Sequence, residues 1–125
     1  MSKRSEVRPK GMPSTWLLGT WKSDKEATIG AWGKHPPRPE AYQTMLLDSL
    51  GKLVQRYTSK RSYAGFEGSG SWAQYRVLWE SKDCLFLVYG TKKDERGLLL
   101  TFPSPSQYWV HVGRYVEYFS KQSDA

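Results

Sequence analysis

The sequence predicts a mainly β protein: a single antiparallel up-and-down β-barrel of about seven to eight strands, with one or two short helices inserted after the first strand. Short runs rich in Val and aromatic residues fill the chain after Gly51 and are separated by Gly, Asp or Pro. The polar connections between these runs are of hairpin length, which favours antiparallel pairing. Both helical segments precede the remaining strands instead of alternating with them, which argues against a parallel βαβ sheet.

The first predicted elements are one strand and two helices. Residues 15–22 form a short apolar and β-branched run that is typical of a strand. Ser23 and Glu26 have the S-x-x-E spacing of a capping box, so a short helix is expected to begin there. The prolines of residues 35–39 interrupt it. A second helix is expected over residues 40–50, where apolar side chains recur at helical spacing before Gly51.

About six further strands are predicted after Gly51, and neighbours in sequence are expected to pair. They cover residues 52–63, 71–81, 84–91, 97–102, 107–113 and 115–120. The folded domain is therefore expected to span residues 15–120. Residues 1–14 are basic and contain Gly and Pro, which predicts a flexible N-terminal tail, and residues 121–125 are expected to be a C-terminal tail.

Composition narrows the class of protein. The chain has 125 residues, the size of one domain, with 6 Trp, 8 Tyr, 4 Phe and a formal net charge of +7. Its longest apolar runs are far too short for a membrane-spanning helix. The N-terminus lacks the apolar segment of a secretory signal, and Cys84 has no second cysteine to pair with, so a cytoplasmic location is expected. Cys84 is expected to be a small buried hydrophobe.

The segment Gly19-Thr20-Trp21 resembles the G-x-W signature at the start of lipocalins and related calycin barrels. The helices after the first strand are similar to those of fatty-acid-binding proteins, although the R-x-Y spacing that holds a carboxylate there is not reproduced. In outline the chain looks like the small bacterial lipocalin-like proteins. The resemblance implies structural roles for Gly19, Trp21 and Arg114, with Trp21 closing one end of the core and Arg114 stacking over it.

The leading functional hypothesis is a binding protein that holds a small hydrophobic or amphipathic ligand inside an aromatic-lined barrel. Strand alternation places aromatic and polar side chains on both faces of residues 71–81 and 107–113. The candidate ligand-binding residues are Tyr75, Arg76, Trp79, Tyr89, Trp109 and His111. Rings would cover the apolar part of the ligand, and a cation or imidazole would meet its polar head. The alternative, in which these aromatic residues simply fill a small core, stays open.

A second hypothesis is an interaction module with a solid barrel. Lys52, Arg56, Lys60 and Arg61 form a basic stretch without an acidic residue, interleaved with Gln and Tyr. Together with the basic tail, such a stripe could bind nucleic acid or an acidic partner. The simpler interpretation is an exposed edge strand whose charges prevent aggregation.

Catalysis and metal binding have little support in the sequence. His35 and His111 are the only histidines, and neither has further ligands at metal-binding spacing. No nucleophile motif selects one Ser, so an enzyme that uses His111 with Arg76 or Arg114 is only a third, weaker possibility. The sequence therefore predicts a non-enzymatic protein without cofactor or metal.

Overall fold

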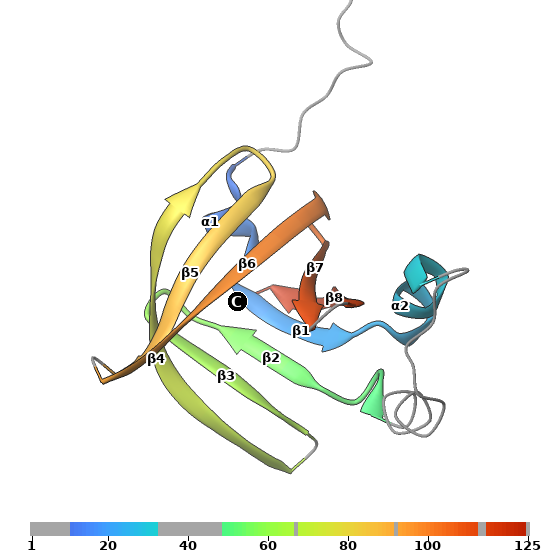
Figure 1. Ribbon diagram of the computed structural model, residues 1–125, viewed down its shortest axis with the longest axis horizontal. Helices are drawn as coiled ribbons and strands as arrows, with labels where there is room; N and C mark the ends of the chain where they lie inside the picture. The colour runs from blue at the N-terminus through green and yellow to red at the C-terminus, as the bar shows by residue number, and fades with distance from the viewer. Residues whose placement is uncertain (1–10, 33–48, 67, 92, 113–114, 125) are drawn as a thin grey trace, which may run out of the picture.

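The computed structural model describes residues 11–32, 49–66, 68–91, 93–112 and 115–124. Within these residues it is a closed antiparallel barrel in which β1 to β8 follow one another around the wall and β8 pairs with β1 (Figure 1). Two short helices, α1 and α2, accompany the barrel. The predicted fold class is confirmed. No helix in the described part of the chain is long and apolar enough to cross a membrane.

The elements divide the chain as follows. Helix α1 is Pro13–Trp16, strand β1 is Gly19–Ser23, and helix α2 is Lys25–Trp32. The remaining strands are β2 (Val54–Tyr57), β3 (Arg61–Phe66), β4 (Ser69–Glu80), β5 (Cys84–Thr91), β6 (Asp94–Ser104), β7 (Gln107–Val112) and β8 (Tyr115–Asp124). The bounds of β5 match the prediction, whereas β8 continues past residue 120, where the sequence placed the start of a C-terminal tail.

Inward-facing residues of most strands build one hydrophobic core. Its buried members are Leu17, Trp21, Tyr57, Leu85, Leu87, Leu100, Phe102, Tyr108, Val110 and Phe119. The rings pack closely, with Trp21 and Tyr108 centred 4.6 Å apart and Tyr108 stacked on Phe119 at 5.2 Å. Aromatic rings, together with Leu and Val side chains, therefore make up much of the core.

The first predicted strand, residues 15–22, is wrong in its first half. Pro13 begins helix α1, because proline is preorganised for the first helical position and has no N–H to leave unpaired. The backbone N–H groups of Thr15 and Trp16 donate to the Met12 carbonyl. Leu17, the residue directly after α1, is fully buried and belongs to the core.

The helix after β1 begins one residue later than the capping box predicted. Asp24 accepts a hydrogen bond from the backbone N–H of Ala27 at 3.0 Å, so Asp24 caps α2. Ser23 instead ends β1, where its hydroxyl binds Glu117 and Gly51. The predicted second helix over residues 40–50 lies almost entirely outside the described residues.

The predicted strand over residues 52–63 is two strands. Thr58 breaks it, because its Oγ1 accepts from the N–H groups of Lys60 and Arg61 and so closes a tight turn. The chain reverses there, and β2 pairs with β3 through Tyr57 and Ser62. This additional hairpin raises the strand number to eight, at the upper limit of the prediction.

Candidate functional site

A pocket of about 150 Å³, open to solvent where Ala64 and Ser71 are exposed, lies between β2, β3, β4, β5 and β6 on the inner side of the barrel wall. Small inward residues on β3 and β4 leave the space: Ser62, Ala64, Ser71 and Ala73. Larger side chains line the rest, among them Gln55, Tyr57, Leu87, Tyr89 and Leu98. The interior is therefore filled on one side and hollow on the other.

Gln55 and Tyr57 are polar lining residues of this pocket, and the buried core residue Tyr108 joins their hydrogen-bond network. The hydroxyls of Tyr57 and Tyr108 both donate to Oε1 of Gln55, the first at 3.3 Å. Burial raises the pKa of Tyr57 and of Tyr108 well above the ordinary value for tyrosine, so both phenols stay protonated at neutral pH. Among the described residues, neither the Gln55 amide nitrogen nor the Tyr89 hydroxyl has a hydrogen-bond partner.

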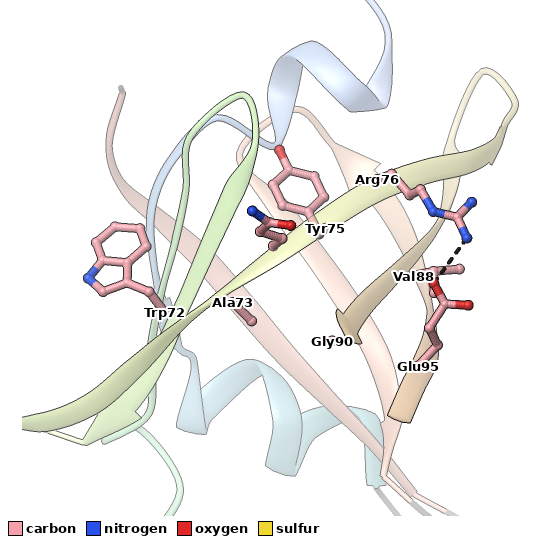
Figure 2. Close-up of a pocket in the computed structure, with 8 residues that line it drawn as sticks. Trp72, Ala73, Tyr75, Arg76, Val88, Gly90 and Glu95 are labelled. Carbon is pink, nitrogen blue, oxygen red and sulfur yellow. Dashed lines mark hydrogen bonds and ion pairs between the residues drawn. The ribbon is translucent and has the colours of Figure 1, made fainter. Parts of the chain in front are cut away.

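The barrel wall has a free edge next to this cavity. Residues 69–74 of β4 pair with β3, whereas within the described residues the pairing of β4 with β5 begins at Tyr75 and Tyr89. An open groove of about 650 Å³ lies along this part of β4, and Ala73 lines both the groove and the interior cavity. Figure 2 shows Tyr75 and Trp72 on β4 and, across the groove, the ion pair of Arg76 with Glu95 at 3.0 Å. The free edge gives a lateral route towards the interior.

Tyr75 lies where β4 stops pairing with β3 and begins to pair with β5. Its ring packs edge-on against Tyr57 at 5.6 Å, and its hydroxyl donates to the Thr58 carbonyl at 2.5 Å. Its backbone N–H donates to the Lys60 carbonyl. Burial raises the pKa of Tyr75, so this hydroxyl is also a neutral donor. Tyr75 thus fixes the β2–β3 turn against the edge of the cavity.

The structure brings together only part of the predicted ligand-binding set. Tyr75 and Tyr89 pack against the core. Trp109 and His111 lie on the outer face of β7, because the residues that alternate with them, Tyr108 and Val110, are buried. Figure 2 shows Arg76 directed to Glu95 at the groove instead of into the cavity.

Trp79 is on the outer surface for a different reason. The predicted alternation placed it on the same face as Tyr75, but the register of β4 shifts between Val77 and Trp79. Such a bulge inserts an extra residue and moves the following side chains to the opposite face. Trp79 is consequently 54% exposed.

The residues that sequence reasoning missed are Gln55, Tyr57 and Tyr108, together with the small residues that leave space. Gln55 and Tyr57 are two residues apart and so share a face of β2, but the neighbouring cations Lys52, Arg56, Lys60 and Arg61 favour interpreting the stretch as a basic outer surface. A repeated Ser-x-Ala pattern at 62–64 and 71–73 was the available signal, since small side chains at alternate positions mark a thin inner wall.

Trp21 has the buried position expected from the G-x-W motif. It is fully buried, and its indole N–H donates to the Leu17 carbonyl at 2.8 Å. The cation over its ring is Lys121 of β8, with Nζ 5.2 Å from the ring centre. Arg114, predicted for this role, lies outside the described residues. Gly19 is buried with φ of 129°, a conformation that favours glycine.

The four predicted cations do not form one stripe. Lys52 and Arg56 line an outer groove near the start of β2, whereas Lys60 and Arg61 lie at the β2–β3 turn. The edge-strand explanation for them is wrong, because β2 pairs with β1 on one side and β3 on the other.

The described part of the chain shows no cluster of side chains that is typical of a catalytic site. It contains no group of three His, Cys, Asp or Glu residues placed to hold a metal ion. Cys84 is half-buried, with Sγ 3.7 Å from the Thr101 hydroxyl, so it is less buried than expected. His111 is exposed against the edge of the Trp109 ring at 5.4 Å.

Comparison of the chain with protein-family models, with curated proteins and with solved structures found no match.

Proposed function

We propose that this chain is a non-enzymatic, lipocalin-like binding protein that holds a small hydrophobic or amphipathic molecule in its barrel. The observation that supports the proposal is the pocket of about 150 Å³ beside Tyr57 and Tyr89, which opens to solvent at Ala64 and Ser71. An enclosed cavity of about this volume accommodates one benzene-sized molecule, so a partly open pocket of the same volume has space for one ring. The proposed ligand is therefore of the size of a single substituted ring.

The chemistry of the cavity favours a neutral ligand. Its described lining residues carry no formal charge, since they are aliphatic, hydroxyl, phenol and amide side chains. Arg76 and His111, which the sequence offered for a charged head group, lie outside the cavity. Burial of an unpaired carboxylate here would be costly, whereas a ligand hydroxyl or carbonyl can pair with Tyr89 or Gln55.

The lining also supports binding over catalysis. Phenols whose pKa is raised by burial are poor bases and nucleophiles at neutral pH, and they serve as hydrogen-bond donors. Gln55 holds both hydroxyls in fixed positions. We therefore propose that these polar side chains orient a ligand and perform no proton transfer.

Phenol is a suitable first probe, and Ala73→Leu is the variant that tests the cavity. Leucine at position 73 fills space shared by the cavity and the lateral groove. We expect phenol at about ten times its Kd to stabilise the wild-type chain by about 1.4 kcal/mol, and Ala73→Leu to lose this effect. Differential scanning calorimetry measures both, and native mass spectrometry of freshly purified protein shows whether a small molecule copurifies.

The control is Ala31→Leu, which adds the same side-chain atoms on the exposed surface of α2. This variant is expected to keep the stabilisation by phenol. Tyr89→Phe is expected to weaken binding of phenol but not of benzene, since only phenol has a hydroxyl to pair with it. Equal stabilisation of wild type and Ala73→Leu would show that phenol binds elsewhere and would contradict the proposal.

A further inference from the structure

A second concave surface lies on the outside of the barrel, where β1, β2 and β3 run side by side. It is a groove of about 580 Å³. Its main lining residues are Lys22, Lys52, Arg56, Tyr63 and Phe66. Arg56 pairs across the sheet with both Thr20 of β1 and Tyr63 of β3, so the strand pairing fixes its place on the outer face.

The groove carries positive charge that the described residues do not neutralise. Lys22, Lys52 and Arg56 are all exposed. The ion pairs of the described residues lie elsewhere, at Arg76, Arg96 and Lys121, and none includes these three cations. No acidic residue is among the described lining residues of the groove. Its charge is therefore complementary to a polyanion.

Aromatic rings stand beside these cations. Phe66 is 50% exposed at the end of β3. Tyr63 is held on one side by Trp72, with ring centres 5.3 Å apart, and on another by Arg56, whose guanidinium carbon lies 5.7 Å from the ring centre. These contacts restrict the Tyr63 ring before any ligand arrives, which lowers the entropy cost of binding.

We propose that this groove binds single-stranded nucleic acid, with Lys22, Lys52 and Arg56 on the phosphates, the exposed Phe66 ring stacking on a base, and Tyr63 supporting Arg56 from below. Single strands combine charge with accessible base faces, whereas duplex DNA hides those faces in its stack. An acidic protein segment would use the cations but would leave the exposed Phe66 ring without a matching group. The combination of cations without ion-pair partners among the described residues and the exposed Phe66 ring therefore favours the single strand.

Fluorescence anisotropy with a labelled oligothymidine of about 12 nucleotides tests the proposal. Three phosphate contacts predict that log Kobs falls with log salt with a slope of about −2. Arg56→Glu is expected to weaken binding at low salt by at least about tenfold and to make the slope shallower by about 0.7. Lys82→Glu makes the same charge change in the exposed β4–β5 turn and is expected to change the affinity less than about twofold.

A second variant tests the proposed stacking of a base on the Phe66 ring. Phe66→Ala is expected to weaken oligothymidine binding by at least about fivefold, because one base–ring contact is lost. Trp79→Ala, which removes a ring of similar exposure outside the groove, is expected to leave the affinity unchanged. Circular dichroism confirms that all four variants fold.

Several results would overturn the proposal. They are absence of binding at low salt, equal weakening by Arg56→Glu and Lys82→Glu, no effect of Phe66→Ala, or equally tight binding of poly-glutamate, which would indicate an acidic protein partner. Ala73→Leu is expected to bind oligothymidine like the wild type, so failure of the interior-ligand proposal is distinguishable from failure of this one.

Discussion

At the scale of single residues, Trp21 of the Gly19-Thr20-Trp21 motif is a central side chain of the core. Its ring contacts Phe102 and Tyr108, and its N–H satisfies the Leu17 carbonyl at the end of α1. Lys121 covers it from β8. One side chain thus joins the N-terminal helix, the first strand and the last strand, so both its ring and its N–H should matter for stability.

Trp21→Phe is expected to destabilise the fold by at least about 2 kcal/mol, because phenylalanine leaves a cavity and an unpaired buried carbonyl. Trp79→Phe is the matched control, since Trp79 is 54% exposed, and a change within about 0.5 kcal/mol is expected. Urea denaturation followed by circular dichroism measures both free energies of unfolding. Similar values for the two variants would contradict the structural role of Trp21.

At the scale of elements, the β3–β4 hairpin shows how glycine lets two strands approach. Gly65 pairs with Gly70, and a Cβ at Gly65 would overlap the Ser69 carbonyl oxygen. Gly30, in helix α2, has no atom near the position of its missing Cβ among the described residues. The two glycines therefore have opposite roles: one is required by packing, and the other only adds backbone freedom to a helix.

Gly65→Ala is accordingly expected to destabilise the protein by about 1–3 kcal/mol, as overpacking forces the strands apart. Gly30→Ala is expected to stabilise it by about 0.5–1 kcal/mol, since alanine is the better helix former. The midpoint of thermal unfolding distinguishes the two directions. A rise in the midpoint for both variants would show that the hairpin tolerates the Cβ.

The same elements show what the sequence could and could not predict. The alternation of β7 was predictable, because burial on one face leaves a period of two at Tyr108 and Val110. The bulge before Trp79 was not, because it depends on how β4 pairs with β5, and no local pattern records that pairing. The turn at Thr58 was not predictable either, because the Lys, Arg and Tyr residues around Thr58 are equally compatible with one continuous strand. The site was therefore only partly predicted, with Tyr75 and Tyr89 inside and Trp79 and His111 outside.

At the scale of the whole molecule, a polar network joins α2 to the first and last strands of the barrel. Ser23 Oγ donates to Glu117 Oε2 at 2.7 Å and accepts from the Gly51 N–H at 3.0 Å. Thr28 of α2 accepts from the backbone N–H of Tyr118, and the Trp32 indole donates to the Val116 carbonyl. In Figure 1 helix α2 lies beside β8, the strand that carries Glu117. This network binds helix, first strand and last strand into one unit that contains a partly buried carboxyl group.

That carboxyl group should couple the stability of the molecule to pH. Burial raises the pKa of Glu117 above its ordinary 4.5, and this outweighs the opposing effect of the hydrogen bond from Ser23. The folded state therefore holds the proton more tightly than the unfolded state does. The stability linked to this proton is fully present below pH 4.5 and is lost as the pH rises through the higher pKa of the folded state.

Glu117→Gln keeps a neutral group that can still accept from Ser23, so it should not lose this stability. We expect the free energy of unfolding of Glu117→Gln, relative to that of the wild type, to increase as the pH rises from about 4.5 to about 8. Glu26→Gln removes an exposed carboxylate from α2 and controls for the change in net charge. Urea denaturation at a series of pH values measures all three proteins. A wild-type stability that rose with pH relative to Glu117→Gln would reverse the sign and show that the ionised carboxylate stabilises the fold.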